Sequence, residues 1–174
     1  EMYKLDRCKT YHAKIDAEHF PGSMTYGECF IRGKVRKTYL VSTYCCHPSM
    51  YNDNISGMIT WARLLALVQR VQTYYSYHFF IAPETLGMLS LLQRRADFSG
   101  AMVVHCAGSD DDFVIKQSWN GNSEMDKAAA VTMHETKHPY RYVPFDVNGS
   151  DERQLQAPAF RIPTVTIARG NYYK

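Results

Sequence analysis

"KTYLVSTYCC", residues 37–46, is the stretch of sequence that decides the fold. Its β-branched and aromatic residues form a continuous apolar run, which is typical of a strand buried on both faces. The run leads through "HPSMYNDN" into "ISGMITWARLLALVQRVQ", residues 55–72, where apolar residues recur near helical spacing. A buried strand followed closely by an amphipathic helix indicates an α/β layer structure.

The same alternation continues along the chain. Further apolar runs that predict strands are "YHFFIAP" (77–83), "AMVVHC" (101–106) and "PTVTIAR" (163–169), and helices are predicted over 85–95 and about 124–137. "DFVIKQS", residues 112–118, is expected to pair as an antiparallel strand, and the first thirty-odd residues are expected to form a hairpin on the sheet edge. The central sheet is therefore predicted to be mixed and largely parallel.

Composition limits the classes of protein that remain. The chain has 174 residues, of which 45% are hydrophobic and 21% charged, so we expect a single domain, residues 1–174. The net charge of +3 is spread without a basic tract, so nucleic acid is not an expected partner. The five cysteines include no CxxC pair, and no apolar stretch reaches the ~18 residues that span a bilayer, so we expect a reduced, cytoplasmic protein away from membranes. Homo-oligomerisation stays open.

Imidazole and carboxylate groups follow three of the predicted strands. His47 and Asp53 come after the first, Glu84 after the second, and His105 with Asp110 after the third. Because ligands bind at the carboxyl ends of strands in open α/β sheets, these groups are expected to meet at one edge. Nitrogen and carboxylate donors suit zinc, and a carboxylate is also needed as a general base, for which Glu84 is the candidate. Taken singly, Asp53 is better explained as a helix N-terminal carboxylate and His47 as a loop histidine, whereas the set of residues that ends three strands favours a site.

Four separate motifs carry a family resemblance. "STYCCHPSMYNDNISG", "APETLG", "KQSWNGN" and "NGSDERQLQAPAFRIP" resemble, in order, a bacterial aminopeptidase-like domain family that is often encoded near surface-polysaccharide biosynthesis genes. That family is distantly similar to the co-catalytic zinc aminopeptidases. The resemblance covers nearly the whole chain and implies a phosphorylase-like fold, a three-layer α/β/α sandwich.

The resemblance also implies a zinc site with one or two ions. His47 and Asp53 would be ligands, with Asp53 able to bridge two ions, Glu84 falls on the glutamate of the family's "PET" motif as base or ligand, and Asp110 falls on an acidic position after "C-x-G". The family supplies a last ligand from a Tyr-His-Thr or Tyr-His-Ser motif, whereas this sequence stops at "ARGNYYK". We therefore expect a domain that lacks its C-terminal end. Trp119 stands where a basic residue is expected.

"GSDERQ", residues 149–154, is a second polar motif with two interpretations. As a substrate-binding segment, Arg153 would contact a substrate carboxylate, and Asp151 or Glu152 would bind an amino terminus. As a helix start, Ser150 would be the cap and the two acids would be stabilised by the helix dipole.

"HETKH", residues 134–138, matches the HExxH motif of helix-borne zinc proteases. Pro139 follows directly and disfavours helical geometry at His138, so the motif is better explained as a helix end. A cysteine hydrolase built on Cys45 or Cys46 is a further alternative, although the neighbouring His47 would point to the opposite face of a strand.

These observations predict a zinc-dependent hydrolase of aminopeptidase type, in which a metal-bound water attacks the carbonyl of a peptide or an amide-bearing small molecule. The alternatives are a catalytically degenerate binding or scaffold module of the same fold and the HExxH protease.

Overall fold

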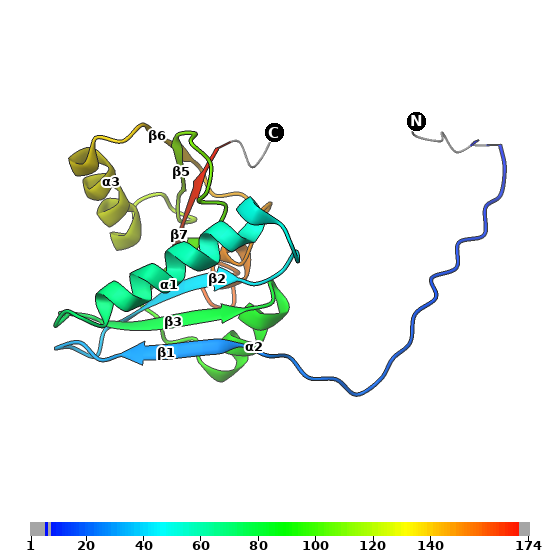
Figure 1. Ribbon diagram of the computed structural model, residues 1–174, viewed down its shortest axis with the longest axis horizontal. Helices are drawn as coiled ribbons and strands as arrows, with labels where there is room; N and C mark the ends of the chain where they lie inside the picture. The colour runs from blue at the N-terminus through cyan, green and yellow to red at the C-terminus, as the bar shows by residue number, and fades with distance from the viewer. Residues whose placement is uncertain (1–5, 7, 171–174) are drawn as a thin grey trace.

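The computed structural model describes residues 6 and 8–170 of the chain. In chain order, the elements are β1 (Gly27–Ile31), β2 (Thr38–Tyr44), η1 (Tyr51–Ser56), α1 (Gly57–Val68), β3 (Ser76–Ala82), α2 (Leu86–Arg94), β4 (Gly100–Val104), β5 (Phe113–Lys116), α3 (Glu124–Thr136), β6 (Tyr140–Val143), α4 (Glu152–Leu155) and β7 (Thr164–Arg169). Residues 8–26 contain no helix or strand, and their trace leaves the body of the domain (Figure 1). None of the helices in the described part of the chain has the length and apolar character needed to span a bilayer.

The strands form one seven-stranded sheet in the order β1-β3-β2-β4-β7-β5-β6. Strands β2, β3, β4 and β7 are parallel to one another, whereas β1 is antiparallel to β3 and β5 is antiparallel to β7. Strand β6 runs parallel to β5. The predicted mixed, largely parallel sheet is confirmed.

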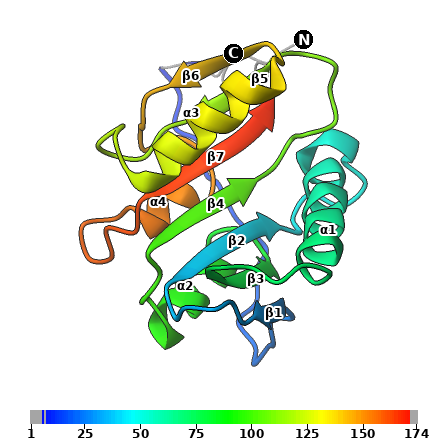
Figure 2. The ribbon, with the colours of Figure 1, turned by 90° about the vertical axis from the view of Figure 1, so that its left-hand side faces the viewer.

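Helices cover both faces of this sheet, which gives the three-layer α/β/α sandwich (Figure 2). On one face, α1 buries Trp61 against Val41 and Phe79, and α3 buries Met133 against Ile115. On the other face, α2 and α4 pack Leu91 and Leu155 into a core with Leu40 and Phe80 of the sheet, where all four side chains are at most 1% exposed. Every residue of β2 is buried, as expected for a central strand covered on both faces.

The order in which successive strands are added to the sheet reverses at β2. The connection through α1 leads from β2 to β3 on one side, and the connection through α2 leads from β3 to β4 on the other side of β2. At such a switch point, the loops after neighbouring strands separate and leave room for a ligand at their carboxyl ends. The segments that follow β2, β3 and β4 are therefore the ones that position a site.

Two local predictions hold. Strand β5 is antiparallel to β7, as predicted for residues 112–118. The helix predicted over about 124–137 is α3, and it begins with a capping box: the Ser123 hydroxyl accepts a hydrogen bond from the backbone N–H of Asp126, and the Asp126 carboxylate accepts one from the backbone N–H of Ser123. This reciprocal arrangement satisfies two backbone donors at the helix start.

The predicted N-terminal hairpin is wrong for the described residues. Strand β1 lies at the sheet edge, but its partner is β3, with Glu28 opposite Phe80, and residues 8–26 form no second strand. The part of that prediction that falls on residues 1–5 and 7 lies outside the described residues. The edge strand β6 is short, and its four residues, "YRYV", carry little hydrophobic signal and are mostly exposed.

Candidate functional site

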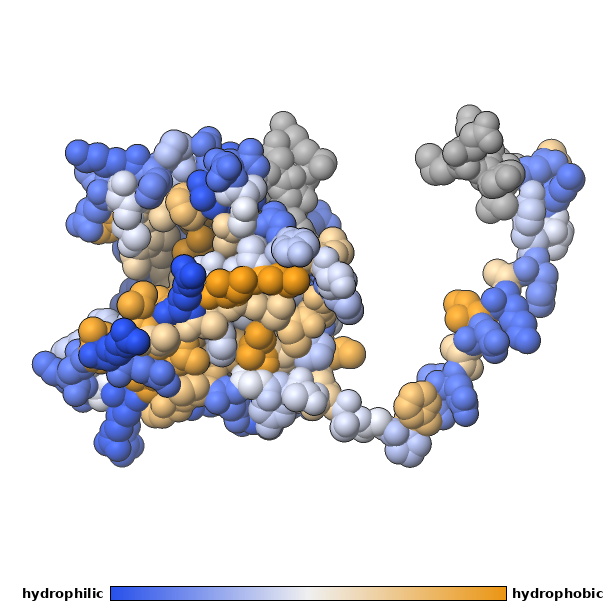
Figure 3. Space-filling view, viewed as in Figure 1, coloured by the Kyte–Doolittle hydropathy of each residue, from blue (hydrophilic) through white to orange (hydrophobic). Residues whose placement is uncertain are grey.

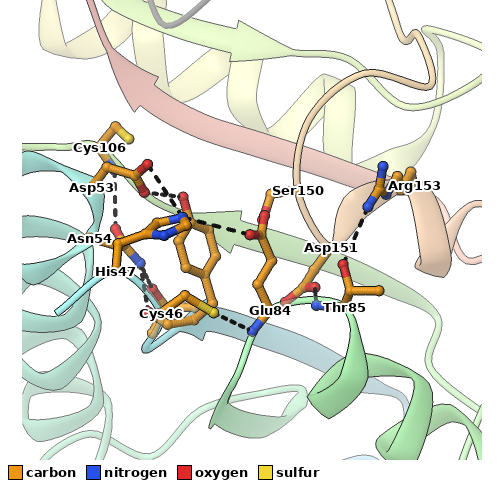
Figure 4. Close-up of polar contacts among 12 residues, drawn as sticks. Cys46, His47, Asp53, Asn54, Glu84, Thr85, Cys106, Ser150, Asp151 and Arg153 are labelled. Atoms are coloured by element: carbon orange, nitrogen blue, oxygen red, sulfur yellow. Dashed lines mark hydrogen bonds and ion pairs between the residues drawn. The ribbon is translucent and has the colours of Figure 1, made fainter. Parts of the chain in front are cut away.

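His47 lies between two carboxylates at the carboxyl edge of the sheet (Figure 4). Its Nε2 atom is 3.7 Å from Oδ2 of Asp53 and 3.9 Å from Oε2 of Glu84. His47 follows β2 in a left-handed backbone conformation, with φ of 57°, which turns the chain away from the strand direction. The side chains of His47, Asp53 and Glu84 are 40%, 18% and 21% exposed, so the group opens to solvent from a sheltered position.

Asp53 is held on its far side by Tyr44. The Tyr44 hydroxyl donates a hydrogen bond of 2.6 Å to Oδ1 of Asp53, which leaves Oδ2 facing His47. The Cys106 thiol lies beside the same carboxylate, and burial, together with the Asp53 charge, raises the pKa of that thiol to about 12. Cys106 therefore stays protonated near neutral pH.

Asn54 anchors the turn that carries Asp53. It is fully buried; its side-chain NH₂ donates to the Thr43 hydroxyl at 2.9 Å and to the Tyr44 carbonyl at 2.8 Å, and its oxygen accepts from the Cys106 backbone N–H at 3.2 Å. The peptide bond between Asp53 and Asn54 is cis. These hydrogen bonds join η1 to both β2 and the segment after β4, so the position of Asp53 is fixed by the strands.

Gly57 permits this close packing at the start of α1. A Cβ atom at this position would lie 2.0 Å from Oδ1 of Asn54 and 2.9 Å from Cα of His105. Neither steric clash can be relieved by the movement of a flexible side chain, because the Asn54 side chain is held by hydrogen bonds and the His105 contact is to a backbone atom. Glycine at the head of α1 therefore lets the helix begin tightly against the sheet.

Glu84 and Thr85 form the turn between β3 and α2. The Glu84 backbone N–H donates to Sγ of Cys46 at 2.8 Å, and the Thr85 backbone N–H donates to Oδ1 of Asp151 at 2.7 Å. Thr85 has a left-handed φ of 64°, which bends the chain sharply after Glu84. Arg153, at the surface, donates to the Thr85 hydroxyl at 3.3 Å. The "GSDERQ" segment thus lies against the turn that carries Glu84.

Asp151 adds a third carboxyl group behind Glu84. Its burial raises its pKa to about 7, and the neighbouring Glu84 charge acts in the same direction, although the hydrogen bond from Thr85 opposes the shift. Together with Asp53 and Glu84, this group makes the edge of the sheet acidic around one imidazole. Such an edge favours a cation.

A buried ion pair supports the segment that carries Asp151. Lys116, at the end of β5, is 2% exposed, and its Nζ lies 3.0 Å from Oε1 of Glu152 and 3.1 Å from Oδ1 of Asp146. It also donates to the carbonyl of Asn148. The Glu152 carboxylate in turn accepts from the backbone N–H of Ser150 at 3.1 Å. Glu152 therefore contacts Lys116 and the loop before α4, and Ser150 is not the helix cap that one interpretation expected, because Asp151 occupies that position.

Asp110 lies apart from His47. It is exposed in the loop between β4 and β5 and lines a separate hollow with Asp111, Asp112 and Arg141. In residues 6 and 8–170, no three His, Cys, Asp or Glu side chains are grouped closely enough to enclose a metal ion. The ligand role of Asp110 stays a prediction. Residues 171–174, at the end of "ARGNYYK", lie outside the described residues.

The HETKH motif does not form a helical histidine pair. Helix α3 ends at Thr136, Lys137 is left-handed, and His138 lies beyond the helix with its ring centroid 5.8 Å from that of Phe113. His134 is on the exposed side of α3. The motif is the helix end that Pro139 indicated.

The thiols beside His47 are poorly suited to nucleophilic catalysis. Burial raises the pKa of both Cys45 and Cys46, and Cys46 accepts the backbone hydrogen bond from Glu84. A reactive cysteine needs a lowered pKa, because the thiolate is the nucleophile.

Tyr44 and Lys116 were missed by the sequence analysis. Tyr44 was one of several tyrosines in a strand and carried no separate signal. Lys116 did carry a signal in the sequence. A lysine at the end of the apolar run "FVIK" is expected to be buried and paired, because lysine is almost never buried without a partner.

The fold is that of an aminopeptidase-like α/β domain. The structure of an aminopeptidase from Aneurinibacillus sp. strain AM-1 matches with a TM-score of 0.70 at 12% identity, over 83% of this chain and 39% of that chain. The Legionella pneumophila LapA aminopeptidase matches with a TM-score of 0.62 at 11% identity, over 83% of this chain and 48% of that chain. At these identities, the likeness concerns the fold.

The chain belongs to the family described as "Domain of unknown function (DUF4910)", which it matches over residues 9–174. A Clostridium acetobutylicum protein, named as a polysaccharide biosynthesis protein with an aminopeptidase-like domain, is 35% identical over 166 residues, or 93% of this chain. A crystal structure of a peptidase from the same organism matches with a TM-score of 0.81 at 33% identity, over 84% of this chain and 36% of that chain. The present chain spans 38% of the length of the named relative.

Proposed function

We propose that this domain carries the site of a metal-dependent hydrolase of aminopeptidase type, which cleaves a peptide or amide bond with an activated water molecule. The observation that carries the proposal is the position of His47, whose Nε2 lies 3.7 Å from Asp53 and 3.9 Å from Glu84. The three residues come from two neighbouring parallel strands at the switch point of the sheet, where ligands bind in this class of fold.

The donor set fits zinc. Imidazole nitrogen and carboxylate oxygen are zinc ligands, and two donors on one tetrahedral ion, each about 2.1 Å from it, lie roughly 3.4 Å apart. The separations around His47 are close to that value. His47 and Asp53 would supply two of its ligands, with Glu84 beside them as the base, and further donors such as Asp110 would be needed to complete the coordination or to hold a second ion. A bound zinc ion would supply Lewis acidity toward the substrate carbonyl and would acidify a water molecule.

The chain's own side chains have separate roles in the proposed reaction. Glu84, whose Oε2 lies 3.9 Å from Nε2 of His47, would take the proton of the attacking water as general base. Tyr44 keeps Asp53 turned toward His47 through its 2.6 Å hydrogen bond. Arg153 is exposed beside the Glu84 turn, where its guanidinium suits a substrate carboxylate, and Asp151 lies close enough to Glu84 to add negative charge for a substrate amino group. The contacts of Glu152 with Lys116 give it a structural role instead.

Metal content tests the proposal directly. The purified chain is dialysed against trace zinc and measured by elemental analysis beside two double variants, His47→Ala/Asp53→Ala and His134→Ala/His138→Ala. We expect about one zinc ion per chain in the parent and in the second variant, and loss of zinc in the first. Loss of zinc only in the second variant would contradict the proposal.

A binding or scaffold module of the same fold is the second candidate. The observation in its favour is that the described residues group no three metal-ligating side chains closely enough to enclose an ion. A parent chain that retains no zinc under these conditions, although it is folded by circular dichroism, would support this candidate. A parent chain with zinc that also hydrolyses aminoacyl amides would exclude it.

A further inference from the structure

A second hollow, of about 310 Å³, lies on the opposite edge of the sheet from His47. Its floor includes Thr38 and Ser76, which are the first residues of β2 and β3, whereas His47 follows the last residue of β2. Its walls carry the basic side chains of Arg32, Lys34, Arg36 and Arg95. Asp97 is the acidic residue among those that line the hollow, and its Oδ1 atom forms an ion pair with Nε of Arg95 at 2.7 Å.

The charged groups of three of these residues have no partner among the described residues. Arg32, Lys34 and Arg36 are exposed, and none of their charged groups forms an ion pair, hydrogen bond or ring contact with another described residue, although the Arg36 backbone carbonyl accepts a hydrogen bond from the Thr38 hydroxyl at 2.9 Å. Two basic residues that are next to the lining residues in the sequence, but do not line the hollow, do have acidic partners. Lys37 lies 2.5 Å from Glu124, and Arg94 lies 3.3 Å from Glu28. Like charges that share one hollow repel one another, so the arrangement is unfavourable by itself and becomes favourable with an anion between them.

The loop that presents the three cations is firmly held. Backbone N–H groups of Gly33, Lys34 and Val35 donate to the Ser76 hydroxyl and to the carbonyls of residues 73 and 74, at 3.1, 3.1 and 3.0 Å respectively. A Cβ atom at Gly33 would lie 2.2 Å from the carbonyl oxygen of Tyr75, so glycine is required for this approach. A ligand therefore meets a backbone that is already ordered, which lowers the entropic cost of binding.

Arg95 is positioned on the facing wall by aromatic rings. Its guanidinium carbon lies 5.1 Å from the ring centroid of Phe98 and 5.7 Å from that of Phe30, which also lines the hollow. Such stacking fixes the plane of a guanidinium. Nη2 of Arg95 also donates to the Thr38 hydroxyl at 3.4 Å, so its remaining outer N–H groups are the ones that stay available.

We propose that this hollow binds a small anion with several negative charges, of the diphosphate type. Guanidinium groups recognise phosphate oxygens with paired hydrogen bonds, and three arginines and a lysine converge here around one carboxylate. The volume lies within the range of small-ligand sites and leaves no room for a nucleic-acid duplex. The site is separate from the His47 group, so it does not depend on the proposed hydrolase.

Calorimetric titration of the whole chain with inorganic pyrophosphate tests the proposal. A chelator is present so that pyrophosphate does not bind through a metal, and ionic strength is held constant. The double variant Arg32→Ala/Arg36→Ala is compared with Arg63→Ala/Lys14→Ala, which removes two exposed positive charges elsewhere. We expect pyrophosphate to bind the parent and the control double variant with similar affinity, and the Arg32→Ala/Arg36→Ala variant at least tenfold more weakly, or about 1.4 kcal/mol.

Two outcomes would overturn the proposal. One is the absence of pyrophosphate binding to the parent chain, and the other is an equal loss in the two double variants, which would show a response to net charge alone. A parallel arm uses vesicles containing phosphoinositide headgroups. Binding to the vesicles without binding to pyrophosphate would also contradict the proposal, because it would assign the cations to a membrane surface.

Discussion

Asp151 accepts a hydrogen bond of 2.7 Å from the backbone N–H of Thr85, the residue that follows Glu84. This bond joins the loop before α4 to the turn after β3, two segments far apart in the sequence (Figure 4). Burial raises the pKa of Asp151 to about 7; the hydrogen bond from Thr85 opposes this shift, and the neighbouring Glu84 charge adds to it. The same contact therefore has a structural role and a pH-dependent one.

Asp151→Asn should change how stability depends on pH. The pKa of Asp151 is raised from 3.8 to about 7 in the folded state. Between these two pH values the folded chain holds a proton that the unfolded chain has lost. The stability contributed by this group is therefore fully present below pH 4 and is lost as the pH rises through 7. The free energy of unfolding contributed by this group then falls by up to about 1.4 kcal/mol per pH unit. Asparagine can still accept the Thr85 hydrogen bond but does not titrate. We expect the stability of the variant relative to the parent to rise from pH 5 to pH 8, as measured by urea denaturation with chelator.

The control for this prediction is Asp16→Asn in the exposed N-terminal segment. Its pH dependence should run parallel to that of the parent. A stability difference between Asp151→Asn and the parent that is constant from pH 5 to pH 8 would show that Asp151 does not titrate in this range.

Lys116→Met should destabilise the domain strongly. The substitution leaves Glu152, which is 1% exposed at its side chain, without its cation at 3.0 Å, and an uncompensated buried charge costs about 3–5 kcal/mol. The double variant Lys116→Met/Glu152→Gln should recover part of that loss. Lys9→Met breaks an exposed pair with Asp6 and should cost less than about 1 kcal/mol. Equal urea midpoints for Lys116→Met and Lys9→Met would contradict the assignment of a buried ion pair.

The core strands and the site differ in how far the sequence reveals them. Strands β2, β3, β4 and β7 are long apolar runs covered on both faces, so local composition predicts them. Strand β1 has an alternating pattern, but its pairing with β3 depends on a partner distant in sequence, and local pattern favoured a hairpin instead. His47 and Glu84 could be placed together because parallel strands share a carboxyl edge.

The groups that support the site could not be predicted in this way. Asparagine beside Asp53 is an ordinary turn residue in the sequence, whereas the hydrogen bonds of Asn54 reach Thr43 near the end of β2 and Cys106 after β4. The contact between Lys116 and Glu152 likewise depends on the packing of α4 against the sheet. A related effect holds at the surface, where Figure 3 shows apolar residues among the polar ones. Leu67 of α1, for example, is 62% exposed although the helical pattern of α1 is amphipathic.

Asn54→Ala should loosen the turn that carries Asp53. The change removes three hydrogen bonds in a fully buried position and leaves the Cys106 N–H without its side-chain acceptor, and each unsatisfied buried group costs about 1–3 kcal/mol. We expect a loss of several kcal/mol in urea denaturation, together with weaker zinc retention. Asn122→Ala, at an exposed position before α3, is the matched control and should change stability by about 0.5 kcal/mol or less. A similar small effect for both variants would show that the buried hydrogen bonds do not fix the turn.

Tyr44→Phe isolates the contribution of one hydroxyl to the proposed metal site. The ring is fully buried and is retained, while the 2.6 Å hydrogen bond to Oδ1 of Asp53 is lost. Groups that orient a metal ligand from outside the coordination sphere change metal affinity by about 10- to 100-fold, and zinc affinity, measured by competition with a chromophoric chelator, should fall within that range. Tyr39→Phe is the control, because it loses a hydrogen bond of the same length, to Glu124, near the opposite edge of the sheet. Equal zinc affinities for the two variants would mean that Tyr44 does not orient Asp53 toward a metal, whereas a loss confined to Tyr44→Phe would assign Asp53 as a ligand through the residue that holds it.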